Sequence, residues 1–130
     1  MINSRSIDDL HEVVKRKCKL HIENCAKRGV HVILTSTLRD DEYQAILYAK
    51  GRTSSGSIVT NLNVTGAHGL GLAYDVVPVV DGKAIWNDNK MWAIIGEEGK
   101  KLGFVWGGDW KKLVDKPHFG IVTGKQIQVS

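Results

Sequence analysis

Hydrophobic positions near the start of the chain recur every three or four residues, which is the spacing of one helix face. They fall within residues 6–28 and are Ile7, Leu10, Val14, Cys18, Ile22 and Cys25. Ser6, with Asp9 three positions later, is suited to cap the first turn, and Gly29 is suited to a left-handed stop. We therefore predict one helix from Ser6 to Arg28, with His21 on its surface.

The next pattern is that of a strand followed by a helix. Residues 30–37, VHVILTST, are rich in β-branched side chains and predict a buried strand. Acidic residues at 40–42 favour a helix start, and this second helix ends at Gly51. The polar stretch of residues 52–66 is long for a loop in a compact domain, which indicates a functional segment such as a substrate-facing wall.

The C-terminal half predicts a hairpin, a third helix and two short strands. LGLAYDVVPVV, an Asp81-Gly82 turn and KAIW form the hairpin, in which Pro78 indicates an edge or a bulge. Asn87 or Asp88 opens the helix, which ends before Gly103, and the segments FVW and HFGIV follow as strands. No repeated βαβ unit is present, so we predict an α+β fold with a small antiparallel sheet flanked by helices.

Composition and net charge indicate a single globular domain but do not indicate its function. The 130 residues are enough for one domain, which we expect to span residues 1–130. The net charge of +4 favours polyanionic partners, but the basic residues are scattered, and no nucleic-acid-binding motif accompanies them. No signal-like or membrane-spanning apolar run is present, and Cys18 and Cys25 are too far apart on one helix to form a disulfide. We expect a monomer with reduced cysteines, made in the cytoplasm of a bacterial host without a signal peptide.

Three residues have the chemistry of a zinc site, which needs three protein ligands and an open fourth position. His68 precedes a Gly-rich turn, Asp75 lies in the following strand, and His118 follows Pro117, which favours an extended backbone before it. Taken singly, each is more often a structural or exposed residue. Their flanking sequences change that interpretation.

Four motifs occur in the order TSTLRDDEYQAILYAKGRT, HGLGLAYD, WGGDW and DKPHF, between about residues 35 and 119. In this order they resemble the M15 family of zinc peptidases, which includes D-Ala-D-Ala carboxypeptidases and VanY-like enzymes. The resemblance is closest to the L-alanyl-D-glutamate endopeptidases of phage endolysins and bacterial wall hydrolases. It implies the D-Ala-D-Ala peptidase fold, which is also that of hedgehog domains.

The resemblance implies a role for six residues. The zinc ligands are His68, Asp75 and His118. Asp115 takes the position of the general base, Arg39 that of a residue stabilising an oxyanion or a substrate carboxylate, and Gln44 lines the pocket. The competing interpretations are an ion pair at the helix start for Arg39 and a turn-capping carboxylate for Asp115. Because three residues of extended chain would send Asp115 and His118 to opposite sides, we also predict a bend before Pro117.

The function implied is zinc-dependent hydrolysis of the L-Ala–D-Glu bond in peptidoglycan stem peptides, with wall lysis after release from the host. A D-Ala-D-Ala carboxypeptidase and a zinc-stabilised binding module without activity are the alternatives. One departure from the family is Gly66 where many relatives have serine, which affects substrate preference rather than the metal ligands. Trp106 and Trp110 either shape the cleft or pack in the core.

Overall fold

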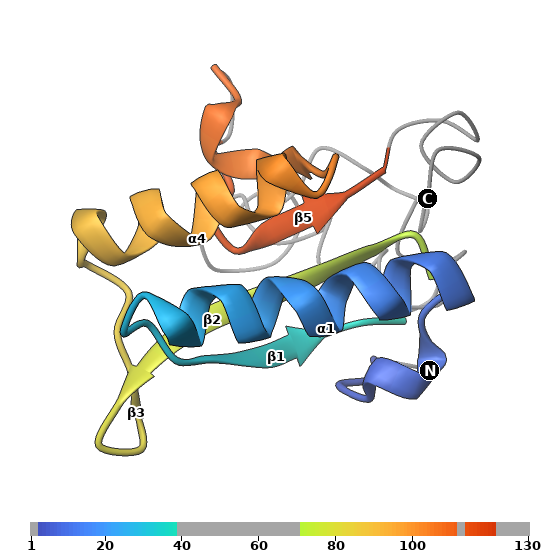
Figure 1. The fold of residues 1–130 in the computed structure, drawn as a ribbon, viewed down its shortest axis with the longest axis horizontal. Helices are drawn as coiled ribbons and strands as arrows, with labels where there is room; N and C mark the ends of the chain where they lie inside the picture. Colours follow the sequence, from blue (N-terminus) through green and yellow to red (C-terminus); the bar gives the residue numbers. More distant parts are fainter. Residues whose placement is uncertain (1–2, 39–70, 112–113, 122–130) are drawn as a thin grey trace, which may run out of the picture.

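Two helices and a small antiparallel sheet make up the part of the protein described by the computed structural model, residues 3–38, 71–111 and 114–121 (Figure 1). The second predicted helix and the polar segment 52–66 lie outside these residues. In chain order the elements are η1 (Ile7–Asp9), α1 (Glu12–Lys27), β1 (Val32–Ser36), β2 (Ala73–Val80), β3 (Lys83–Ala84), α4 (Asn89–Lys101), β4 (Val105–Trp106), η2 (Gly107–Asp109) and β5 (His118–Gly120). Among the described helices, none combines the length and the apolar character that a bilayer crossing requires.

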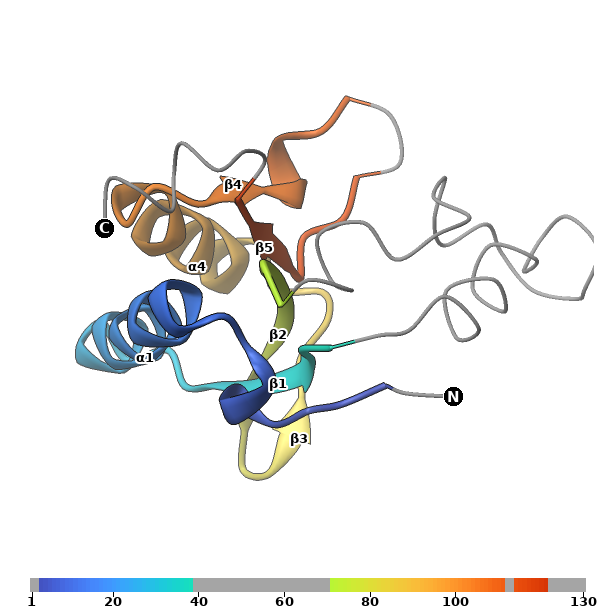
Figure 2. The same cartoon turned by 90° about the vertical axis from the view of Figure 1, so that its right-hand side faces the viewer.

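The sheet has the order β1-β2-β5-β4, and β3 pairs with β2 beside this path. Every described pair is antiparallel. Figure 2 shows α1 and α4 together on one side of the sheet. The α+β prediction with an antiparallel sheet is confirmed, as are the hairpin turn at Asp81 and Gly82 and the cap of α4 by Asp88.

Side-chain alternation along β2 and β5 separates a core face from an opposite face. Tyr74 and Phe119 are fully buried, and both rings contact His21 of α1. Gly99 of α4 packs so closely that an added Cβ would lie 2.4 Å from the Phe119 ring. Burying an aromatic or aliphatic side chain of this size stabilises the fold by roughly 1.5–3 kcal/mol. The neighbouring residues Asp75 and His118 therefore project from the other face.

The first predicted helix is interrupted, which corrects the single span from Ser6 to Arg28. Ser6 caps only η1, and the backbone is extended at Leu10. The amide of His11 donates instead to the carbonyl of Gly71, at 3.0 Å, and the His11 imidazole accepts from Val13 N to cap α1. The break arises because this turn pairs with a distant segment.

Pro78 also differs from its prediction, because β2 is an inner strand rather than an edge. The Val79 amide donates to His31 O on the β1 side, so the nitrogen of Pro78 faces the other side of β2. On that side β5 pairs with β2 only over 73–75, and β3 pairs only from Val79 onward. The Pro78 carbonyl still accepts from the Ile85 amide at 2.8 Å, and the missing N–H of proline ends the ladder between β2 and β3 there.

His21 is buried, with 1% of its surface exposed, and the prediction of a surface histidine is wrong. Its Nε2 lies 2.8 Å from the carbonyl oxygen of Ile95, which can only accept, so Nε2 carries the proton. Nδ1 then accepts from the hydroxyl of Tyr74 at 2.6 Å. Burial lowers the pKa of His21, which favours the neutral ring. His21 thus links α1, β2 and α4 on the face of the sheet that the helices cover.

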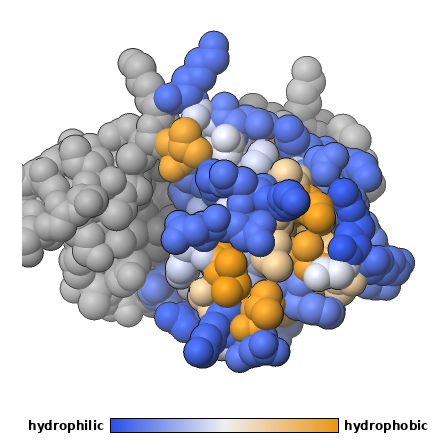
Figure 3. All heavy atoms as spheres, turned by 90° about the vertical axis from the view of Figure 1, so that its left-hand side faces the viewer, coloured by the Kyte–Doolittle hydropathy of each residue, from blue (hydrophilic) through white to orange (hydrophobic). Residues whose placement is uncertain are grey.

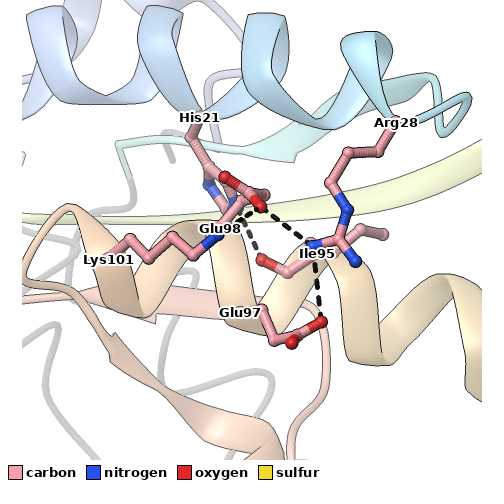
Figure 4. Close-up of polar contacts among 6 residues, drawn as sticks. All are labelled: His21, Arg28, Ile95, Glu97, Glu98 and Lys101. Carbon is pink, nitrogen blue, oxygen red and sulfur yellow. Dashed lines mark hydrogen bonds and ion pairs between the residues drawn. The ribbon is translucent and has the colours of Figure 1, made fainter.

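An ion-pair cluster joins Arg28, the residue after α1, to the second half of α4 (Figure 4). The Arg28 guanidinium lies 2.9 Å from the carboxylate of Glu98 and 3.3 Å from that of Glu97, and Lys101 lies 3.1 Å from Glu98. The hydrogen bond from Arg28 lowers the pKa of Glu98. Glu98 is thereby held ionised at the helix contact, although its side chain is only 8% exposed.

Both cysteines are buried free thiols, as predicted. Burial raises the pKa of Cys18 to about 12 and that of Cys25 to about 11. Because the thiolate is the reactive and metal-binding form, neither residue is prepared for redox or metal chemistry near neutral pH.

Candidate metal centre

Asp75 and His118 occupy directly opposed positions on β2 and β5. Side chains at opposed positions of an antiparallel pair lie on the same face with their Cβ atoms about 5 Å apart. Here Asp75 Oδ1 and His118 Nδ1 are 3.6 Å apart, and both side chains are mostly but not fully buried. The strand register, rather than a loop, therefore brings these two donor groups together.

A turn at Lys116 and Pro117 brings Asp115 to the same place. The His118 amide donates to the Asp115 carbonyl at 3.1 Å, which closes the turn. Donor atoms of Asp75, Asp115 and His118 all lie within 4.8 Å of one another. The bend that the sequence predicted before Pro117 is present.

The Trp106–Gly107 segment holds this turn through two hydrogen bonds. Gly107 O accepts from the Asp115 amide at 2.9 Å, and Trp106 Nε1 donates to Lys116 O at 2.7 Å. A Cβ on Gly107 would lie 2.1 Å from the Asp115 carbonyl oxygen, so no side chain fits there. The close approach of the two backbones depends on glycine.

The remaining residues of the WGGDW motif differ in what they contact. A Cβ on Gly108 would lie 2.2 Å from the Trp106 ring, which stacks on Phe119 with centroids 6.3 Å apart. Trp110 lies beside His118, with 5.0 Å between ring centroids, and keeps 38% of its surface exposed. Asp109 pairs with Lys100 at the surface. Of the two tryptophans, Trp106 thus packs against the core and Trp110 borders the donor cluster.

The Asp75–His118 pair fits a zinc ion in both chemistry and spacing. Carboxylate oxygen and imidazole nitrogen are normal zinc ligands, and tetrahedral coordination at the usual bond lengths separates neighbouring ligand atoms by about 3.3 to 3.6 Å. The distance of 3.6 Å between Asp75 Oδ1 and His118 Nδ1 lies at the upper end of that range. His118 Nε2 points elsewhere, since it lies 3.3 Å from the Cβ position of Gly120.

Of the six site residues predicted, Asp75, Asp115 and His118 lie together in the structure. The other three, His68, Arg39 and Gln44, lie outside the described residues. Sequence reasoning did not assign the supporting roles of Trp106 and Gly107. Their signal was present in the WGGDW motif, but the contacts that explain it join Trp106 and Gly107 to Asp115, Lys116 and Phe119, further along the chain.

Comparison with known sequences identifies the family. The profile of the M15 peptidases described as D-alanyl-D-alanine carboxypeptidase matches residues 61–121. The peptidoglycan L-alanyl-D-glutamate endopeptidase CwlK of Bacillus subtilis strain 168 is 36% identical over 124 residues, covering 88% of this chain and 74% of CwlK. This chain belongs to the M15 peptidase family. The predicted family is thus confirmed, and with it the prediction that the chain is a peptidase.

A second sequence relative and two crystal structures extend the comparison. The L-alanyl-D-glutamate peptidase of Listeria phage A118 is 30% identical over 121 residues, and the chain spans 38% of its length. The L-Ala D-Glu endopeptidase ChiX of Serratia marcescens has the same fold, with a TM-score of 0.60, 22% identity and coverage of 97% of this chain and 92% of ChiX. A mutant of the vancomycin resistance D,D-pentapeptidase VanY, solved in complex with Zn(II), gives a TM-score of 0.65 at 14% identity, covering 99% and 83% of the two chains.

Proposed function

We propose that this M15 peptidase hydrolyses the bond between L-Ala and D-Glu in the stem peptides of peptidoglycan, using one zinc ion. The observation that carries the proposal is the meeting of Asp75, Asp115 and His118 on one face of the sheet. The names of CwlK and the phage A118 enzyme, two sequence relatives, support the choice of bond. The alternative is a D-Ala-D-Ala carboxypeptidase, the activity by which the family profile is described.

The proposed metal ligands are Asp75 and His118 from the sheet, together with His68 from the part of the chain outside the described residues. Zinc, when bound, polarises a carbonyl and makes water acidic enough to attack near neutral pH. Three protein ligands leave a fourth position open for that chemistry.

Asp115 is proposed as the general base rather than as a ligand. Its carboxylate belongs to the same cluster of donor atoms, and its backbone is fixed by Gly107 O and by the amide of His118. A carboxylate held this way can take a proton from the attacking water and deliver it to the leaving amine of D-Glu. Arg39 is proposed to balance the developing oxyanion charge and Gln44 to line the pocket, both on sequence grounds.

The competing idea of a binding module without activity is less well supported. A structural zinc site needs four closed ligands and no adjacent base, whereas here a second carboxylate is held next to the Asp75–His118 pair by backbone hydrogen bonds. A requirement for glycine at position 107 is expected if the position of Asp115 matters for turnover, because a side chain there would displace Asp115.

The experiment that tests the bond cleaved is digestion of purified peptidoglycan followed by mass analysis of the products. New amino termini on D-Glu are expected, with L-Ala left on the glycan. Release of free D-Ala as the sole product would replace the proposal with the carboxypeptidase alternative. Intact stem peptides after prolonged digestion by zinc-loaded protein would support the inactive binding module.

A further inference from the structure

A pocket of about 550 Å³ adjoins the proposed metal centre at Asp115, which is one of its lining residues. Its walls come from the start of α4, the chain before it and the turn that leads into β5: Trp86, Trp92, Val114, Asp115, Lys116 and Pro117. The volume lies within the range of pockets that hold small ligands. Asp115 belongs both to this pocket and to the donor cluster, so anything bound here lies beside the reacting groups.

Two of the pocket residues present apolar surface to solvent. Trp86 is 53% exposed and Val114 is 52% exposed, whereas Trp92 is 2% exposed and forms part of the core. The fold uses the backbone of Trp86, because its carbonyl accepts from Trp92 Nε1 at 2.9 Å. The exposed indole of Trp86 is thus not required for that bond.

Besides Asp115, the pocket wall contains the basic side chain of Lys116. Lys116 Nζ donates to Asn89 Oδ1 at 2.9 Å, and an ammonium group has three donors, so it can also serve a carbonyl or hydroxyl of a ligand. Figure 3 looks onto the side of the molecule that lies at the left of Figure 1, where hydrophobic residues form small groups among hydrophilic ones. An exposed aromatic face beside a hydrogen-bond donor suits a sugar ring, which has an apolar C–H face and a polar rim.

The chemistry of the proposed substrate requires a sugar close to the reacting groups. In peptidoglycan the L-Ala of the stem peptide is joined by an amide bond to the lactyl group of N-acetylmuramic acid. One residue and one lactyl unit therefore separate the scissile carbonyl from the ring. At about 3.5 Å for each unit, the ring begins roughly 7 Å from the bond that is cut.

We propose that this pocket binds the N-acetylmuramoyl sugar of the substrate, with the ring against Trp86 and a carbonyl or hydroxyl oxygen near Lys116. The inference rests on the proposed function, because it takes the L-Ala–D-Glu bond as the bond at the metal centre. It makes Trp86 a specificity-determining residue that selects stem peptides still attached to glycan.

The kinetic test compares two substrates that differ only at the amino end, N-acetylmuramoyl-L-Ala-D-Glu-L-Lys and N-acetyl-L-Ala-D-Glu-L-Lys. The zinc-loaded parent should prefer the muramoyl substrate. Trp86→Ala should reduce that preference, measured as the ratio of the two kcat/KM values, by roughly three- to tenfold, the usual worth of an aromatic contact. Trp86→Phe, which keeps a ring, should retain most of it. Leu20→Ala, an exposed apolar position on α1, is the matched control and should leave the ratio unchanged.

A binding measurement tests the sugar pocket independently of the cleavage reaction. On adding N-acetylmuramic acid, which has no peptide bond to cut, the indole N–H signal of Trp86 should shift in NMR spectra, and Trp86→Ala should weaken the binding. An equal loss on both substrates, or no loss on either, would overturn the sugar pocket while leaving the endopeptidase in place. A Trp86 shift in a protein that cuts neither substrate would support the pocket and reject the proposed function. If the Trp86 signal does not shift and neither substrate is cut, both the sugar pocket and the proposed function are rejected.

Discussion

Asp75 and His118 face each other from opposed positions of β2 and β5, with 3.6 Å between Oδ1 and Nδ1. Their neighbours Tyr74 and Phe119 are also opposed, and these face the helices. A slip of one residue in this pairing would exchange the two faces of a strand. The aromatic core that fixes the register therefore also fixes the donor pair.

Removal of the metal is expected to abolish hydrolysis. Protein purified without added metal should contain close to one zinc per chain by elemental analysis. Thorough chelation should stop wall lysis and lower the melting temperature, because a ligand that binds only the folded state stabilises it. Returning zinc should restore both. A chelated protein that lyses walls at the parent rate would show that hydrolysis needs no metal.

Gly107→Ala is expected to reduce turnover by displacing Asp115. The added Cβ would lie 2.1 Å from the Asp115 carbonyl oxygen, so the two segments must separate. Such overpacking should cost about 1–3 kcal/mol of stability, and a shift of about 1 Å in a reacting group can lower turnover by as much as 10²-fold.

The matched control for that variant is Asp109→Ala in the same motif. It removes only an exposed ion pair with Lys100 and should change the rate and the melting temperature little. Equal rates for Gly107→Ala and Asp109→Ala would mean that the contact between Gly107 and Asp115 does not set the catalytic geometry.

The fold should lose stability in mild acid because of His21. Burial lowers the pKa of His21 below its ordinary value of 6.5, although the hydrogen bond to the Ile95 carbonyl and the charge of Glu98, both on α4, act to raise it. Tyr74 on β2 occupies the other ring nitrogen. The unfolded state then binds the proton more readily. The contribution is complete above the unfolded pKa of about 6.5 and is lost as the pH falls toward the folded pKa, by at most about 1.4 kcal/mol per pH unit.

Chemical denaturation between pH 7.5 and 5 measures this dependence. His21→Phe should be less stable throughout, and its stability should fall less steeply with decreasing pH than that of the parent. His31→Gln, at an exposed position, should keep the parent slope. An unchanged slope in His21→Phe would assign the acid sensitivity to other groups.

Elements whose ends are set by neighbouring residues were predictable from sequence. Asp88 and Gly103 bound α4 as predicted because capping is a local interaction, and the Asp81-Gly82 turn follows from the conformations open to its residues. The break at His11 was not predictable, since its partner is the carbonyl of Gly71 far along the chain. Hydrophobic periodicity also missed the burial of His21, because a polar ring enters a core only when distant partners satisfy it.

Part of the site was predictable for a different reason. The positions of Asp75 and His118 follow from two strand patterns, but their pairing was inferred through resemblance to the M15 family. The support by Trp106 and Gly107 needed the structure, since both hydrogen bonds join segments that are separate in sequence. The sequence supplied the residue types, and the tertiary contacts supplied their roles.

The division of roles between Asp115 and His118 is the central claim, and a paired measurement on Asp115→Ala and His118→Ala tests it most directly. Zinc content, melting temperature and wall-lysis rate should be measured side by side for both variants and the parent. Asp115→Ala should keep its zinc and its fold but lose on the order of 10²-fold or more in turnover, whereas His118→Ala should lose the metal as well. An Asp115→Ala protein that lyses walls at the parent rate would contradict the account and leave Asp115 as a turn residue.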